Sequence, residues 1–185
     1  MNERRQQLIE KYYQNKIQGV SLVLDNVWDP HNVAAVSRSA DGFGIETIYL
    51  YYTYNKCPNM RQTGSSSSSS ANRWMRFERA RDLSFFADKK AEGYQIWGAD
   101  FQPQAINLTQ CVIPPKCLIV MGSESKGISP ELREIMDQYV FIPMVGMVES
   151  YNISVATSVI LYEVYRQRGQ NLSLQVDSSL RGSRQ

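Results

Sequence analysis

Short runs of apolar residues alternate with segments of helical periodicity along most of this chain. Uninterrupted apolar runs are typical of strands that are buried on both faces of a parallel sheet. Helices placed between such strands indicate the layered α/β class. We therefore predict an open, mostly parallel sheet with helices on both faces. The predicted strands are residues 20–24, 45–52, 94–99, 118–121 and 140–144.

The predicted helices carry start signals in the sequence. Asp29-Pro30 and Ser129-Pro130 each place an N-cap residue before a proline at the first helical position. Near the C-terminus, Asn152 or Ser150 supplies a side-chain oxygen that can cap a helix, and apolar residues follow at helical spacing. The predicted helices are residues 2–16, those beginning at 30 and 130, residues 83–91 and residues 152–168.

A single domain is expected for residues 1–169, because a chain of 185 residues is long enough to bury one core. The polar segment 170–185 is predicted to be a tail. Residues 54–72 show no periodicity and include six consecutive serines at 65–70. A loop of this length inside a domain is either functional or flexible, and the sequence leaves both readings open.

Composition limits the class of protein. Hydrophobic residues make up 43% of the chain and charged residues 21%, which is typical of a globular protein. The longest apolar run, 117–121, is too short to span a bilayer, and the N-terminus lacks the apolar core of a signal peptide. The three cysteines have no metal-ligand spacing. We therefore expect a cytoplasmic protein without a metal site or a membrane partner.

The net charge of +2 is unevenly distributed. Residues 1–16 carry four basic and two acidic side chains and residues 166–185 carry four and one, so the body between them nets −3. Arginines between 61 and 81 are interleaved with Trp74 and Phe77. That mixture suits phosphate contact with base stacking, and equally a solvated charged face around two core aromatics. The candidate RNA-binding residues are Arg4, Arg5, Lys11, Arg61, Arg73, Arg76, Arg166 and Arg168.

Polar or glycine-rich segments follow three of the predicted strands, at residues 25–38, 122–130 and 145–156. Open α/β sheets bind ligands beyond the carboxyl ends of their strands. The glycines lack the spacing of a phosphate loop or of a dinucleotide fingerprint. In the third segment, small polar residues at a helix N-terminus suit an electron-rich ligand, or they form an ordinary cap.

Taken together, the three segments resemble the SPOUT superfamily, and within it the SpoU/TrmH family of RNA ribose 2′-O-methyltransferases. The first motif of that family is an asparagine followed six residues later by an arginine, here Asn32 and Arg38. The second is Gly-x-Glu-x-x-Gly after a strand, which begins here at Gly122 and includes Glu124. The third matches residues 142–156.

The resemblance implies a C-terminal trefoil knot, S-adenosylmethionine as cofactor, and a homodimer in which an arginine of one subunit faces the cofactor of the other. We expect helix 152–168 at the dimer interface, because Ile160, Leu161, Val164 and Tyr165 exceed what one core face needs. A glycine at 122 is expected to let the backbone approach the ligand closely. The implied cofactor-binding residues are Ala99, Gly122, Ile142, Met147, Ser150 and Tyr151.

The resemblance makes Arg38 the catalytic candidate, on the helix face opposite Val33, Val36 and Ala40. A guanidinium is normally protonated, so the sequence leaves open whether Arg38 acts as the base or positions an RNA phosphate. His31, the chain's one histidine, is interpreted as incidental. The residues expected to position Arg38 and the substrate through hydrogen bonds are Asn32, Glu124, Ser150 and Asn152.

The expected reaction is methylation of a ribose 2′-hydroxyl in RNA. The leading helix and the form of the first motif are most similar to family members that methylate a D-loop guanosine of tRNA, and no separate N-terminal RNA-binding domain is expected. Methylation of ribosomal RNA and a catalytically silent RNA-binding or cofactor-sensing protein are the alternatives. Where relatives have a K-T-S-x-G-A loop, this chain has serines at 65–70, which leaves substrate contact by that loop open.

Overall fold

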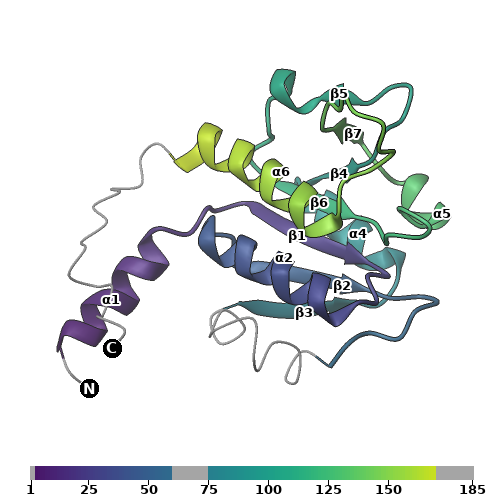
Figure 1. The fold of residues 1–185 in the computed structure, drawn as a ribbon. Helices are drawn as coiled ribbons and strands as arrows, with labels where there is room; N and C mark the ends of the chain where they lie inside the picture. Colours follow the sequence, from purple (N-terminus) through teal and green to yellow (C-terminus); the bar gives the residue numbers. More distant parts are fainter. Residues whose placement is uncertain (1–2, 60–74, 170–185) are drawn as a thin grey trace.

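The computed structural model describes residues 3–59 and 75–169, which contain one sheet of seven strands in the order β3-β2-β1-β6-β4-β7-β5. Every strand pair in this sheet is parallel (Figure 1). The predicted α/β class with a parallel sheet is therefore confirmed. The strands are β1 (Val20–Asp25), β2 (Thr47–Tyr51), β3 (Arg76–Ala80), β4 (Gln95–Ala99), β5 (Ile106–Asn107), β6 (Cys117–Met121) and β7 (Gln138–Phe141).

Helices cover both faces of the sheet, as predicted, with α2 and α6 together on one side (Figure 1). Five of the helices were expected, and their ends agree with the sequence pattern to within a few residues. The helices are α1 (Glu3–Gln14), α2 (Pro30–Gly42), α4 (Leu83–Ala91), α5 (Pro130–Arg133) and α6 (Ile153–Arg168), with the short 3₁₀ helix η1 (Leu108–Gln110).

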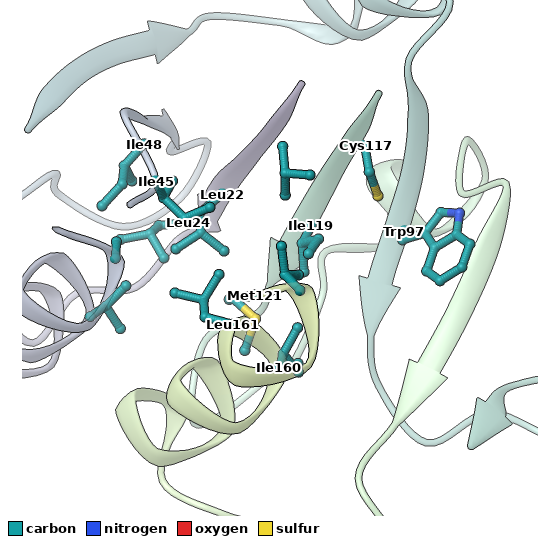
Figure 2. Packing of buried hydrophobic residues seen from close by; sticks show 14 of the residues in the cluster. Leu22, Leu24, Ile45, Ile48, Trp97, Cys117, Ile119, Met121, Ile160 and Leu161 are labelled. Atoms are coloured by element: carbon teal, nitrogen blue, oxygen red, sulfur yellow. The ribbon is translucent and has the colours of Figure 1, made fainter. Parts of the chain in front are cut away.

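One layer of apolar side chains lies on each side of the sheet. Figure 2 shows Leu22 of β1 and Ile119 of β6 packed with Leu161 of α6, in the layer beneath α2 and α6. On the opposite face, Val120 of β6 packs in a second cluster that includes Phe86 of α4. Burial of the central strands on both faces explains why β1 and β6 are continuous apolar runs.

Two strands were missed because neither is an apolar run. β3 contains Arg76, Phe77 and Glu78 and lies at one edge of the sheet, where it pairs only with β2. β5 has two residues and lies at the other edge. An edge strand is less covered by neighbours, so its sequence need not be apolar. The predicted strand 140–144 was displaced, since β7 ends at Phe141 and Ile142 already belongs to the following loop.

The apolar residues of α6 that are exposed are not those that the sequence pattern predicted. Ile160, Leu161 and Val164 are buried within the chain's own core, so the argument that they exceed one core face was wrong. The apolar residues of α6 that remain exposed are Val155, Val159 and Tyr162.

Side-chain caps form at two of the three predicted positions. Asp29 accepts a hydrogen bond from the His31 backbone N–H, and Asn152 accepts one from Ser154. Ser129 is the N-cap residue of α5, as predicted, but its side chain makes no cap hydrogen bond. Its backbone N–H donates at 2.5 Å to the carboxylate of Asp25. Burial raises the pKa of this carboxyl group. This contact joins the end of β1 to the loop before α5.

Threading of the chain is not established by strand order and pairing, so the trefoil knot stays a prediction. None of the helices in the described ranges has the length and apolar character of a membrane span.

The loop after β6 folds back on itself at Gly122. Ser123 and Gly127 exchange backbone hydrogen bonds of 2.8 and 3.0 Å, and Gly127 has a φ of 65°. A Cβ at position 122 would lie 2.3 Å from the carbonyl carbon of Gly127. Glycine at 122 is thus required by the loop's own backbone, which differs from the expected reason, close approach to a ligand.

We predict that Gly122→Ala lowers the free energy of unfolding by about 2 kcal/mol, because overpacking against backbone cannot be relieved by a rotamer change. Urea denaturation measures the effect. Gly146→Ala is the matched control, since a Cβ there meets no atom within 4 Å. Equal stabilities of the two variants would contradict the packing argument.

Candidate functional site

The three motif segments meet at the carboxyl edge of the sheet. β1 and β6 pair from Val20 with Cys117 to Leu24 with Met121, so the chain leaves both strands side by side. β4 lies next to β6, and β7 next to β4, which brings the end of β7 to the same edge. The carboxyl ends of parallel strands lie at the same edge of a sheet, so this juxtaposition follows from the topology.

A chain of side-chain hydrogen bonds joins the three segments. The Nδ2 of Asn32 donates to Oε1 of Glu124 at 2.5 Å, and Nδ2 of Asn152 donates to Oδ1 of Asn32 at 3.1 Å. Asn152 also accepts from the N–H and the hydroxyl of Ser154 at 2.9 and 2.6 Å. We call Asn32, Glu124 and Asn152 the relay. One residue from each motif is therefore in direct contact with a residue of another.

The N-terminal part of α6 packs along α2. The hydroxyls of Ser39 on α2 and Ser158 on α6 are 2.8 Å apart, within hydrogen-bond distance, at the contact between the two helices. This packing fixes the helix that carries Asn32 against the helix that begins after Asn152.

Arg38 is exposed on α2, whereas Val33, Val36 and Ala40 are buried. The expected placement of Arg38 away from the core is confirmed. It follows Asn32 by six residues, which corresponds to roughly 9 Å along a helix axis. Arg38 is thus displaced from the relay toward the C-terminal end of α2.

Two adjoining hollows of about 160 and 280 Å³ lie beside the relay. They share a wall from the end of β4 and from the segment before α6. Ile142 lines the first hollow only, while Gly122, Glu124 and Asn152 line the second only. The shared lining residues are Ala99, Asp100, Ser150, Tyr151 and Ala156.

The structure brings together five of the six expected cofactor-binding residues. Met147 lines neither hollow and its side chain is fully exposed, so its contact with a cofactor stays a prediction. Ser150 lines both hollows but forms no hydrogen bond with a residue of the relay, so its positioning role stays a prediction as well.

Sequence reasoning missed Asp100 as a lining residue. Its carboxylate is 3.2 Å from Arg133 and accepts a hydrogen bond from Gln102, so it joins β4 to the end of α5. The signal was available, because Asp100 is the first polar residue after the predicted strand 94–99. His31 is exposed and contributes its backbone N–H to the cap of α2, in line with the interpretation that it is incidental.

The candidate RNA-binding residues are dispersed. Arg4, Arg5 and Lys11 belong to α1, while Arg61 and Arg73 lie outside the described residues, as do the serines at 65–70 and the tail. Arg76 is exposed on β3 and forms an ion pair with Glu78.

The two arginines at the end of α6 make contacts within the chain. Arg166 forms an ion pair with Glu163 at 2.6 Å, and Arg168 donates to the carbonyls of Ile113 and Pro114. The Arg166 pair lies within α6, whereas the contacts of Arg168 anchor the end of α6 to the segment after η1. Contact with RNA by either arginine stays a prediction.

Comparisons with known proteins converge on one family. The profile of the SpoU rRNA Methylase family matches residues 19–162. A tRNA (guanosine(18)-2′-O)-methyltransferase from Aquifex aeolicus is 30% identical over 167 residues, which cover 90% of this chain and 78% of that protein. The crystal structure of the A. aeolicus TrmH/SpoU tRNA modifying enzyme superposes with a TM-score of 0.82, covering 90% of this chain and 84% of that one.

Two further relatives are longer than this chain. The tRNA (guanosine(18)-2′-O)-methyltransferase of Escherichia coli K12 is 32% identical over 150 residues, which cover 80% of this chain and 64% of that protein. The SpoU methyltransferase AviRb of Streptomyces viridochromogenes, solved in complex with the cofactor AdoMet, is 25% identical with a TM-score of 0.70. That match covers 81% of this chain and 58% of AviRb.

We predict that Asn152→Asp and Asn152→Ala differ in stability, because Asn152 both caps α6 and donates to Asn32. Aspartate keeps the capping oxygen and is favourable at a helix N-terminus, so the free energy of unfolding should change by less than about 0.5 kcal/mol. Alanine removes the cap and should cost about 1 kcal/mol. Urea denaturation distinguishes them. The same loss in both variants would show that the donation to Asn32, and not the cap, carries the stability.

Proposed function

This chain belongs to the SpoU rRNA Methylase family, and we propose that it is an enzyme that transfers a methyl group from S-adenosylmethionine to the ribose 2′-hydroxyl of a D-loop guanosine in tRNA. The observation that carries the proposal is the relay of Asn32, Glu124 and Asn152 beside a two-part hollow. The names of the A. aeolicus and E. coli relatives support guanosine in tRNA as the substrate.

The lining of the hollows fits S-adenosylmethionine, which AviRb also binds. Ala99, Ile142 and Tyr151 offer the apolar walls that a purine needs, and the backbone beyond β6 and β7 offers polar groups for its edge. Ser150 would contact the cofactor from the segment before α6. When bound, the cofactor supplies an electrophilic methyl group on a sulfonium.

The chain's own residues then orient the nucleophile. Transfer requires the O2′ of the ribose to lie in line with the methyl group and to lose its proton. The relay sets the side-chain geometry where the three motifs meet, and Glu124 orients Asn32 through their hydrogen bond. Arg38 would act through the positive charge of its guanidinium, by stabilising the negative charge that develops on O2′ and attracting the neighbouring phosphate.

We also propose a homodimer in which Arg38 faces the hollow of the partner subunit. Arg38 lies roughly 9 Å along α2 from Asn32, whereas Val155, Val159 and Tyr162 form an exposed apolar stripe on the adjacent α6. Positions i, i+4 and i+7 share one helix face, so the stripe is continuous. Val145 and Val148 add exposed apolar surface in the loop before α6. A second copy of the chain would cover this surface.

The remaining expectations form part of the same proposal. Residues 1–169 form one methyltransferase domain and 170–185 a tail. RNA is attracted by the basic residues of α1, by Arg76 and by the arginines outside the described residues. The cysteines are free, which supports a cytoplasmic location. Ribosomal RNA is the second candidate substrate, because the family description itself names it.

The first test is methyl transfer to tRNA transcripts followed by mapping of ribose methylation. We expect a single methylated guanosine in the D-loop, and Arg38→Ala should lower kcat by roughly 10²–10⁴-fold, as for a group that acts on the reacting proton or charge. Cofactor affinity measured by calorimetry should be unchanged. Near-normal turnover of Arg38→Ala would exclude a catalytic role for Arg38. Methyl transfer to ribosomal RNA and not to tRNA would show that ribosomal RNA is the substrate.

The second test concerns assembly. We predict that Val159→Asp converts a dimer into a monomer in sedimentation equilibrium, because it places a charge in the apolar stripe, and that activity falls with dimer content. Leu83→Asp is the matched control, since Leu83 and Val159 are each 38% exposed and Leu83 lies on α4. A wild-type protein that is an active monomer at micromolar concentration would overturn the dimer.

A further inference from the structure

The loops after β1 and β2 are fastened together by Asn26. Its side-chain oxygen accepts the backbone N–H groups of Thr53, Tyr54 and Asn55 at 3.0 to 3.1 Å. The amide of Asn55 donates back to the carbonyl of Asn26 at 2.7 Å. Asn26 itself has a φ of 54°, a conformation that asparagine tolerates better than most residues. The two loops therefore form one rigid edge beside the relay.

A tyrosine and a lysine connect this edge to the loop after β6. The hydroxyl of Tyr54 is 3.3 Å from that of Ser123, and the Nζ of Lys126 lies 4.5 Å from the centre of the Tyr54 ring. Lys126 follows Glu124 of the relay by two residues, and it forms no ion pair with any described residue. Its positive charge is thus positioned by an aromatic face and remains available to an anion.

Trp28 is exposed at the same edge. It lies between Val27, which is fully buried, and the helix cap Asp29, and 56% of its surface is accessible. Asn32 of the relay follows four residues later. The buried Val27 and the helix cap Asp29 hold the backbone on both sides of Trp28, so the exposed indole is presented next to the relay as a surface on which a flat ring can stack.

We propose that Trp28 stacks on an unpaired nucleobase of the RNA while Lys126 contacts an adjacent phosphate. This subsite rests on the proposed function, because that function places the reacting ribose at the relay. Bases in single-stranded loops are unstacked and bind to aromatic side chains, and a nearby ammonium binds the backbone that links them. Trp28 precedes Asn32 by four residues and Lys126 follows Glu124 by two, and Asn32 is hydrogen-bonded to Glu124, so the two groups belong to loops that meet at the relay.

Intrinsic fluorescence tests stacking without any methyl transfer. In a Trp74→Phe background the remaining indoles are Trp28, which is exposed, and Trp97, which is 5% exposed in the core. Unmodified tRNA added without cofactor should quench the signal, and the quenching should disappear in a variant that also carries Trp28→Phe. Quenching that persists in that variant, or none in the Trp74→Phe protein, would overturn the stacking contact.

Steady-state kinetics distinguish a requirement for an aromatic ring at position 28 from a requirement for a large apolar side chain. Trp28→Leu should raise the KM for tRNA roughly tenfold or more while kcat and cofactor affinity stay near normal, and Trp28→Phe should recover much of the loss. Equal KM values for the leucine and phenylalanine variants would overturn the proposal, as would loss of cofactor binding in Trp28→Leu, which would assign Trp28 to the fold.

Salt dependence tests Lys126. Lys126→Gln should reduce the slope of log affinity against log salt by close to one unit, as expected for one lost phosphate contact. Lys90→Gln is the control, because Lys90 lies at the end of α4, next to the start of β4, and pairs with Asp137. Equal slopes in both variants would overturn the phosphate contact. Trp28-dependent quenching in the Trp74→Phe protein without methyl transfer to any RNA would instead reject the proposed function and leave the subsite intact.

Discussion

The parallel pairing of β1 with β6 is the constraint on which the rest of this structure depends. The two strands lie almost a hundred residues apart in the sequence, yet five consecutive residues of each pair side by side. Both are buried on both faces, so a shift in register would break the packing of two core layers at once. Because the strands are parallel, the chain leaves them at the same edge, and the loops that carry Asn32 and Glu124 must be neighbours.

The polar contacts of the site are too weak to build this arrangement. A hydrogen bond between partly exposed side chains contributes about 1 kcal/mol net, and the relay has two of them between motifs. The rigid scaffold instead comes from buried strands, from the close backbone approach at Gly122 and from the fastening of two loops by Asn26. The relay then sets the side-chain geometry within a frame that is already fixed, which is what precise placement of a nucleophile requires.

Charge is used in two distinct ways along the chain. At the end of α6, Arg166 and Arg168 make contacts with Glu163 and with backbone carbonyls, so their charges serve the fold. At the carboxyl edge, Lys126 lies against a tyrosine ring and forms no ion pair with any described residue. Net charge alone does not distinguish these uses. The body between the two basic ends nets −3, so the proposed RNA contacts depend on a few positioned cations more than on the overall field of the protein.

The sequence by itself determined the α/β class, the central strands, the cap at Asp29 and the three segments of the site, because burial on both faces and helix capping leave local patterns. For α6 it offered Asn152 or Ser150 as the cap, and the structure has Asn152. Only the tertiary structure decided the rest. β3 is a strand because β2 lies beside it, and Ile160 faces the core rather than a partner. Ser129 is the N-cap of α5, but it bonds to Asp25 through its backbone N–H and its hydroxyl makes no cap hydrogen bond. Each of these outcomes depends on which segments meet in the folded sheet. The local sequence around a residue does not specify which distant residue it will contact.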